Sequence, residues 1–244
     1  MDTLKMLWGF IKNARYLKGM TRKTVATVVS VEHPHGDYYT IALKPAQGFS
    51  WNAGEHVMLR LPDHEEVKKD YRILSIASIQ EEGVLLFGTR TGREASAFKK
   101  ALLSLKPGDP VSVQGAFGWF RVRDEQSPIV LFAGGVGVTP VRALVKELAH
   151  SQARPIHIVY SSVEFYLFGD EIRAIADSNP SMTLYAVSTP EETQARLAAL
   201  AGQYGNRAYY YMSASPAVIG SVAKLLRARG VSGGRLIDDT MRGY

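Results

Sequence analysis

The sequence predicts an antiparallel β-barrel followed by a five-stranded parallel α/β domain. Three observations support this prediction. Residues 22–124 contain short strand-like runs with Gly, Pro and Asp between them, as in antiparallel hairpins. From residue 127 onward, apolar strand-like runs alternate with amphipathic helical segments, which is typical of a parallel sheet covered by helices. A glycine-rich turn at residues 134–140 joins an apolar run directly to a helical pattern.

The first half is predicted to contain six or seven strands and one helix. Residues 24–31 alternate in polarity, and a His-Gly-Asp turn then leads to a returning strand at residues 38–43. Residues 94–105 are predicted to form a helix, because their apolar positions recur at helical spacing. The remaining strands are expected at residues 56–61, 71–76, 83–91, 110–114 and 119–122.

The second half is predicted to place helices on both sides of its sheet. Residues 129–133 are apolar and rich in β-formers, as expected for a strand buried on both faces. Parallel sheets of this kind bind ligands at the carboxyl ends of their strands, which is where the glycine turn lies. The other strands are expected at residues 155–160, 182–187, 207–212 and 235–238, and the helices near residues 140–150, 170–177, 191–203 and 216–229.

The glycine turn, GGVGVTP at residues 134–140, has the chemistry of an anion site. Its glycines allow positive φ and let backbone N–H groups approach a ligand, and the helix start adds a partial positive charge. Thr139 is predicted to cap the helix, with Pro140 at the first helical position. Because Pro140 replaces the third glycine of the usual dinucleotide pattern, a tight turn without a ligand is the alternative.

The N-terminal segment, residues 1–21, is predicted to be a basic amphipathic helix. The first 24 residues contain six basic residues and one acidic residue, which gives a net charge of +5. The apolar face of this segment is too interrupted to span a bilayer, and the segment lacks a signal-peptide core. We expect it to pack on its own domain or on a partner subunit; peripheral membrane contact through residues 1–20 of a cytoplasmic protein is the alternative.

Composition excludes several classes of function. An apolar share of 46% and a charged share of 21% are ordinary for a soluble globular protein. The absence of cysteine excludes disulfides, thiolate zinc sites and iron–sulfur clusters held by this chain. The six histidines have no metal-ligand spacing, so no metal site is predicted. Nothing beyond the N-terminal segment builds a basic stripe or an aromatic platform, so nucleic-acid binding is not expected.

Five motifs follow one another along the chain. Residues 72–78 read RILSIAS, residues 92–98 read GREASAF, and the glycine turn comes next. Residues 213–216 read SASP, and residues 239–244 read DTMRGY. In this order they resemble motifs of the ferredoxin–NADP⁺ reductase family of flavoproteins. The first two resemble the flavin-binding R-x-Y-S-x-x-S and G-x-x-S, and the glycine turn resembles the family's nucleotide-binding turn. The last two resemble C-G-x-P and the C-terminal D-x-F-x-G-Y.

The resemblance implies a flavin-binding barrel at residues 22–125 and an NAD(P)-binding α/β domain at residues 126–244. Family members use the arginine of the first motif on the flavin phosphate and its first serine near the redox edge of the ring. Ser75 and Ser213 would be the catalytic contacts. Carried over residue by residue, the resemblance assigns cofactor binding to Arg72, Leu74, Ser75, Ser78, Gly92, Ser96, Gly135, Gly137, Thr139, Pro140, Ser213 and Tyr244.

Several positions depart from the family pattern. Leu74 replaces the tyrosine that packs on the flavin, which removes aromatic stacking worth about 1 kcal/mol. Ser213 replaces the cysteine that approaches the nicotinamide, and Met241 replaces a terminal aromatic residue. Val163 stands where many NADP-preferring members place an arginine for the 2′-phosphate. The absence of that arginine favours NADH over NADPH. Arg173 and Arg196 are the cations that could take over its role.

The resemblance therefore implies a flavin-dependent NAD(P)H reductase. It would pass a hydride from NADH, or from NADPH, to FAD rather than FMN, and then single electrons to ferredoxin, flavodoxin or another acceptor. The expected partners are the nicotinamide nucleotide and a redox partner protein or small electron acceptor. The alternative is an electron-transfer or regulatory subunit with little or no dehydrogenase activity, docked through its N-terminal helix to a partner or a membrane.

Overall fold

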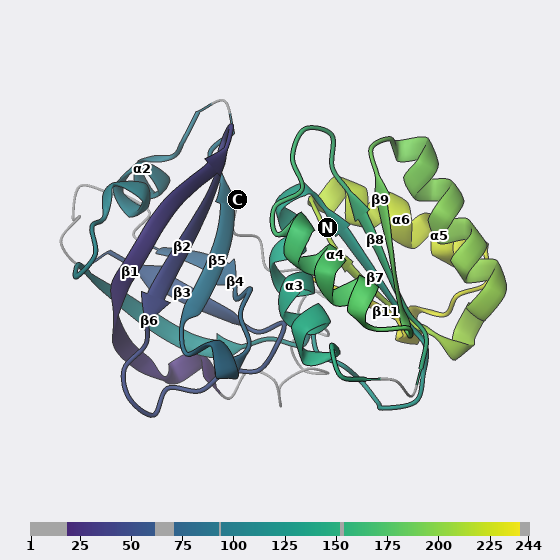
Figure 1. Ribbon diagram of the computed structural model, residues 1–244, viewed down its shortest axis with the longest axis horizontal. Coiled ribbons are helices and arrows are strands. Elements are labelled where there is room, and N and C mark those ends of the chain that lie inside the picture. Colours follow the sequence, from purple (N-terminus) through teal and green to yellow (C-terminus); the bar gives the residue numbers. More distant parts are fainter. Residues whose placement is uncertain (1–18, 62–70, 93, 152–153, 240–244) are drawn as a thin grey trace, which may run out of the picture.

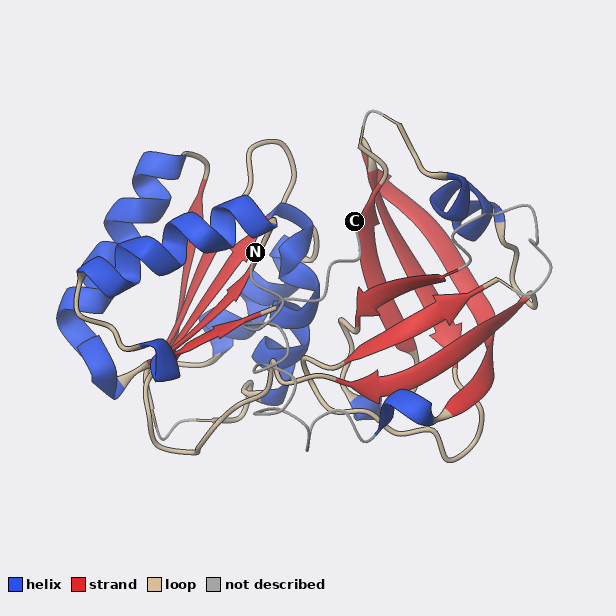
Figure 2. Cartoon of the chain, turned by 180° about the vertical axis from the view of Figure 1, so that it is seen from behind, coloured by secondary structure: helices blue, strands red, loops and turns tan. Residues whose placement is uncertain are grey.

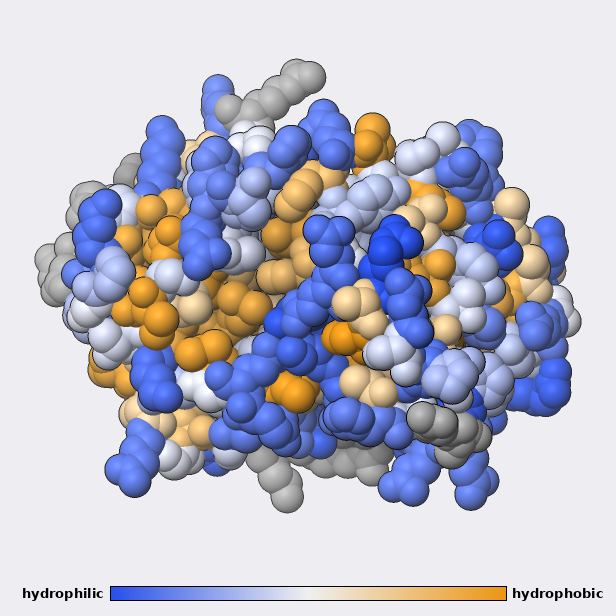
Figure 3. All heavy atoms as spheres, in the orientation of Figure 1, coloured by the Kyte–Doolittle hydropathy of each residue, from blue (hydrophilic) through white to orange (hydrophobic). Residues whose placement is uncertain are grey.

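The computed structural model describes residues 19–61, 71–92, 94–151 and 154–239. The described chain forms two units side by side (Figure 1), which we call the N-terminal unit (strands β1–β6) and the C-terminal unit (strands β7–β11). Figure 3 shows a band of hydrophilic side chains crossing the lower part of their junction. Among the described helices, none is long and apolar enough to cross a membrane. The predicted N-terminal helix, Met241 and Tyr244 lie outside the described residues.

The N-terminal unit is a six-stranded antiparallel sheet in the order β4-β3-β6-β1-β2-β5. The strands curl strongly, as Figure 2 shows. They enclose a hydrophobic core, and α2 (Ala97–Ser104) covers that core with Phe98 and Leu102. Among the described residues, no ladder joins β4 to β5, so the predicted barrel is a strongly curled sheet and not a closed one. The strands are β1 (Lys23–His35), β2 (Tyr38–Lys44), β3 (His56–Arg60), β4 (Tyr71–Ser75), β5 (Leu85–Arg90) and β6 (Pro110–Phe117).

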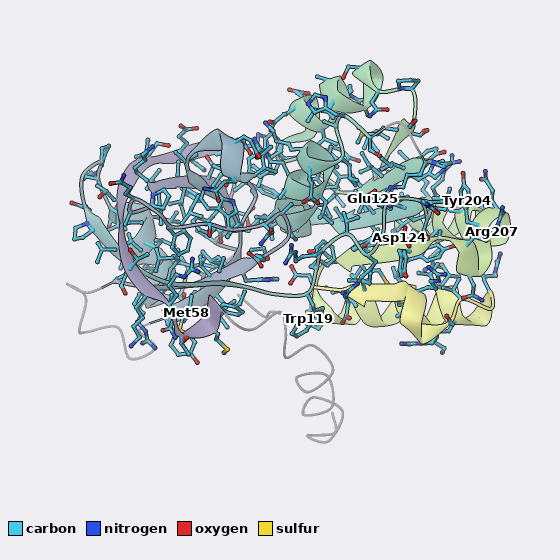
Figure 4. The ribbon with its side chains drawn as sticks, turned by 90° about the horizontal axis from the view of Figure 1, so that it is seen from below. Met58, Trp119, Asp124, Glu125, Tyr204 and Arg207 are labelled. Atoms are coloured by element: carbon cyan, nitrogen blue, oxygen red, sulfur yellow. The ribbon has the colours of Figure 1, made fainter. Side chains whose placement is uncertain are left out.

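The predicted strand at residues 119–122 is wrong. Gly118 has a φ of +138°, and the chain then leaves the sheet and crosses to the C-terminal unit. Figure 4 shows Trp119 at the junction of the units and Asp124 over the C-terminal unit. The ring of Phe120 meets that of Tyr211 edge to face at 5.5 Å. The apolar residues of this segment therefore reflect packing between the units and not strand pairing.

The C-terminal unit is the predicted five-stranded parallel sheet, in the order β11-β10-β7-β8-β9. Alternate side chains of the central strand β7 enter two different cores: Leu131 packs with α3 and α4, and Phe132 packs with α5 and α6. This double burial explains why β7 is apolar throughout. The strands are β7 (Ile129–Gly134), β8 (Ile156–Ser161), β9 (Met182–Val187), β10 (Tyr209–Ser213) and β11 (Leu236–Asp238), and the helices are α3 (Val138–Glu147), α4 (Gly169–Ser178), α5 (Pro190–Tyr204) and α6 (Pro216–Ala228).

The glycine turn follows β7 at the point where the strand order changes direction. β8 lies on one side of β7 and β10 on the other, so their carboxyl ends diverge and leave room for a ligand. The turn contains the short 3₁₀ helix η3 (Gly135–Gly137), which leads directly into α3. The predicted N-cap is wrong, because α3 begins at Val138 and the Thr139 hydroxyl donates to the carbonyl of Val136 at 2.7 Å.

Candidate functional site

A cleft of about 960 Å³ opens at the carboxyl ends of the parallel strands. The C-terminal unit contributes the glycine turn and the ends of β8 and β10, among them Ser161 and Ala214. The N-terminal unit contributes Arg90, Gly92 and Lys99. A volume of this size is typical of small-molecule sites. The cleft therefore lies where the sheet topology predicts ligand binding and is bounded by both units.

Arg90 and Lys99 line the N-terminal side of this cleft, and Arg72 lies close enough for its charge to act on Lys99. We call these three residues the cation cluster. Arg72 and Ser96 line neither the cleft nor the second cavity described below. The Nη2 of Arg72 donates to the hydroxyl of Ser96 at 3.3 Å, so two predicted flavin-phosphate residues meet. Ser96 is also the N-cap of α2, since its side chain accepts from the amide of Lys99. The start of the helix adds a partial positive charge at this place.

Within the cation cluster, Lys99 lies close to two like charges. Arg90 pairs with Asp37 at 2.9 Å, while the ammonium of Lys99 donates to the carbonyl of Arg90. Burial, reinforced by the positive charges of Arg72 and Arg90, lowers the pKa of Lys99. An anion bound here would relieve this repulsion, so the cluster fits a phosphate.

The glycine turn approaches the end of β10 too closely for side chains. A Cβ on Gly137 would lie 2.2 Å from the carbonyl oxygen of Ser213, and one on Gly134 would lie 2.8 Å from the Cβ of Ala214. Gly135 has a φ of +53°, which other residues rarely adopt. Glycine is therefore required at this turn for close backbone approach as well as for conformation.

A second, narrower cavity of about 40 Å³ lies between the units, and we call it the inter-unit cavity. Ser75 and Leu74 line it from the N-terminal unit, and Ser213 lines it from the C-terminal unit. The glycine turn contributes to both hollows, because Val136 lines the cleft as well as the inter-unit cavity. The structure thus brings the two predicted catalytic serines to one place. Gly137, Thr139 and Pro140 also line this cavity.

Asp239 holds both serine hydroxyls. Its Oδ2 accepts from the hydroxyl of Ser75 at 3.0 Å and from the hydroxyl of Ser213 at 3.1 Å. Its Oδ1 lies 2.6 Å from Nε2 of His56. Burial by itself would raise the pKa of Asp239, but His56 and the two hydroxyls outweigh it and lower the pKa. A buried carboxylate is therefore kept ionised between the units.

The wall of the cleft beyond β8 carries an acid and no cation. Val163 lines it with 82% of its surface exposed, and Glu164 follows. Among the described residues that the C-terminal unit contributes to the cleft, none is Lys or Arg. Arg196 packs over the ring of Tyr185 at 4.1 Å and does not line the cleft.

Comparison with known proteins identifies the architecture. No family model matches the chain. The toluate 1,2-dioxygenase electron transfer component of Pseudomonas putida is 27% identical over 191 residues, which cover 73% of this chain and 55% of that protein. A cytochrome P450 reductase from Amycolatopsis superposes with a TM-score of 0.77 at 22% identity, over 90% of this chain and 70% of that one.

A ferredoxin NADP⁺ reductase from Neisseria gonorrhoeae, solved with bound FAD and NADP, superposes with a TM-score of 0.75 at 14% identity, over 90% of this chain and 98% of that one. The chain has the fold of the ferredoxin–NADP⁺ reductases. The predicted resemblance and fold class are thereby confirmed. The chain spans about half the length of the curated relatives that it matches, with 55% of the first and 44% of the second covered.

Two of the predicted cofactor-binding residues, Ser78 and Gly92, make hydrogen bonds within the N-terminal unit. Ser78 is fully buried and lines neither hollow; its hydroxyl donates to Val84 at 2.6 Å and accepts from the amide of Leu86 at 3.0 Å. The hydroxyl of Ser78 therefore stabilises the turn before β5, and its cofactor contact stays a prediction. The amide of Gly92 donates to Asp37 at 3.0 Å, although Gly92 does line the cleft.

Sequence reasoning missed Lys99, His56 and the role of Asp239. Lys99 could have been found, because it lies three residues after the N-cap Ser96, where a helix start would bind an anion. Asp239 directly follows β11 at the ligand-binding edge of the sheet. His56 carried no sequence signal, because its partner lies 183 residues away. Its Nδ1 is buried without a partner among the described residues.

Proposed function

We propose that the chain is a flavin-dependent NADH reductase that holds FAD and passes electrons singly to a separate acceptor. The observation that carries the proposal is the inter-unit cavity, where Ser75 and Ser213 share the carboxylate of Asp239 beside the glycine turn. A flavin ring is larger than this cavity of about 40 Å³, so only the reactive edge of a flavin would reach it. A flavin placed so would accept a hydride and release electrons one at a time, which is chemistry of the cofactor and not of the protein.

The residues on the N-terminal side fit a flavin. Arg72, Ser96 and Lys99 would hold its phosphates through charge-assisted hydrogen bonds, and the repulsion among the cations supports such an anion. Leu74 would cover one face of the ring from the wall of the inter-unit cavity. FAD is proposed over FMN, because the Neisseria neighbour was solved with FAD.

The residues on the C-terminal side fit a nicotinamide dinucleotide. The glycine turn would receive its pyrophosphate at the start of α3. Ser213 and Ser75, both oriented by Asp239, would contact the nicotinamide and the flavin edge from opposite walls. NADH is preferred in this proposal, because Glu164 would accept a hydrogen bond from the ribose and repel the 2′-phosphate of NADPH.

The electron acceptor is proposed to be a separate carrier protein or a small oxidant. The chain has no cysteine to ligate a cluster of its own. The Pseudomonas putida relative is named as the electron transfer component of a dioxygenase, which supports a protein acceptor for this chain too. A cytoplasmic location is part of the proposal, and contact of residues 1–20 with a partner or a membrane stays a prediction from their sequence.

Anaerobic reduction of the purified protein tests the proposal. The protein should be yellow, and NADH should bleach its flavin faster than NADPH does at equal subsaturating concentration. A colourless protein that takes up neither FAD nor FMN would refute the flavoprotein assignment. A flavin that dithionite bleaches and neither nucleotide reduces would favour the subunit without dehydrogenase activity.

A further inference from the structure

Arg142 on α3 uses every N–H group that it has. Its Nε and Nη2 donate to Glu171 at 2.6 and 2.7 Å, and its Nη1 and Nη2 donate to Glu82 at 3.0 and 2.8 Å. The remaining N–H of Nη1 donates to the carbonyl of Ala77 at 2.8 Å. The residue is only 4% exposed. All five donors of the guanidinium are therefore satisfied in one fixed orientation.

These bonds cross the junction of the two units. Arg142 and Glu171 belong to the C-terminal unit, whereas Ala77 and Glu82 belong to the N-terminal unit. Lys146 lies 3.2 Å from Glu82 and 3.0 Å from Glu171, so two cations alternate with two carboxylates. We call this group the clamp. A buried ion pair adds little stability over well-packed apolar residues, so its value here lies in fixing geometry.

The clamp lies next to both walls of the inter-unit cavity. Ala77 is two residues beyond Ser75, and its own amide is fixed by the carbonyl of Leu86 at 2.7 Å. Arg142 is two residues beyond Pro140, within the same rigid helix. A shift of the clamp would therefore change the distance between the Ser75 wall and the Pro140 wall. Hydride transfer requires reacting atoms about 3–3.5 Å apart, and a displacement of about 1 Å can cost about 100-fold in rate.

We propose that Arg142 is a positioning residue, which holds the nicotinamide-binding wall at hydride-transfer distance from the flavin-binding wall. This inference rests on the proposed reductase function. In this inference the clamp fixes how the two units are placed relative to each other and does not bind either cofactor. Arg142 lines neither the cleft nor the inter-unit cavity.

Two matched substitutions test the proposal. Glu82→Gln removes a carboxylate that faces Arg142 from the other unit, and Glu171→Gln removes one that faces it from the same unit. Glu82→Gln should slow the limiting rate of anaerobic flavin reduction by about tenfold, with the NADH dissociation constant nearly unchanged. Its charge-transfer absorbance between nicotinamide and flavin should weaken. Glu171→Gln leaves the bonds of Arg142 across the junction in place, so it should slow the rate less than Glu82→Gln does.

Distances between spin labels test the placement without NADH. Because the chain has no cysteine, Lys100→Cys on α2 and Lys224→Cys on α6 provide unique, exposed label sites, one in each unit. Glu82→Gln should broaden the distance distribution, and Arg142→Lys, which keeps the charge with fewer donors, should broaden it less than Arg142→Gln.

Equal flavin-reduction rates in Glu82→Gln and Glu171→Gln would overturn the inference, and so would identical, narrow distance distributions. If NADH fails to reduce even the wild-type flavin, the proposed function fails. The label distances still decide in that case whether the clamp places the units, so the two failures are distinguishable.

Discussion

Asp239 connects both units through a single carboxylate. The sequence motifs predicted Ser75 and Ser213, because each stands in a recognisable pattern at the end of a strand. They could not predict that one buried acid binds both hydroxyls and His56, since these contacts depend on how two sheets meet. Short motifs report local chemistry, whereas the partner of a buried group is set by tertiary structure.

Replacing Asp239 by Asn should destabilise the protein and slow flavin reduction. The amide keeps one acceptor but loses the charge that binds two hydroxyls and His56, which should lower the free energy of unfolding by about 1–3 kcal/mol. The loss is measured by urea unfolding, with the reduction rate followed by stopped flow. Asp238→Asn is the control. Burial already raises the pKa of Asp238, so replacing this carboxylate by a neutral amide should lower the free energy of unfolding less. Equal losses in the two variants would contradict a special role for Asp239.

At the scale of elements, periodicity and turn chemistry predicted the parallel sheet and its helices within a few residues. The errors occur where tertiary contact overrides local pattern. Residues 119–122 are rich in the aromatic and β-branched residues of strands, but Phe120 packs against Tyr211. Thr139 is a residue type that often caps helices, but here the preceding 3₁₀ turn starts the helix at Val138. The glycine turn was predicted from its residues, but its contact with the end of β10 required the structure.

Gly137→Ala should weaken nucleotide binding while flavin is retained. The added Cβ would lie 2.2 Å from the backbone oxygen of Ser213, so the turn or the end of β10 must move. This movement should lower the free energy of unfolding by about 1–3 kcal/mol. NADH titration and urea unfolding measure the two effects. Gly202→Ala is the opposite control: nothing lies within 4 Å of its Cβ inside α5, so it should stabilise by about 0.5–1 kcal/mol. A Gly137→Ala protein with wild-type stability and NADH affinity would rule out this role for the close approach.

For the whole molecule, ion pairs between described residues join the units, among them His56 with Asp239 and Arg142 with Glu82. Neither pair could be predicted, because their members lie 183 and 60 residues apart and nothing local links them. The sequence predicted what each unit is, and the structure adds how the units are held together. Both contacts depend on an ionised carboxylate, so the placement of the units should depend on pH.

Acid should weaken the junction between the units. Burial alone would raise the pKa of Glu82, but the hydrogen bond from Arg142, the Ile79 amide and the nearby cations lower it below the ordinary value of 4.5. Because the folded-state pKa is the lower one, the stabilisation is complete above about pH 4.5 and is lost as the pH falls through the folded-state pKa. The free energy of unfolding, measured in urea between about pH 6 and pH 3, should therefore fall less steeply for Glu82→Gln than for the wild type. The two slopes differ only if the Glu82 carboxylate is protonated more readily in the unfolded chain than in the clamp, so parallel pH profiles would show that Arg142 does not hold it.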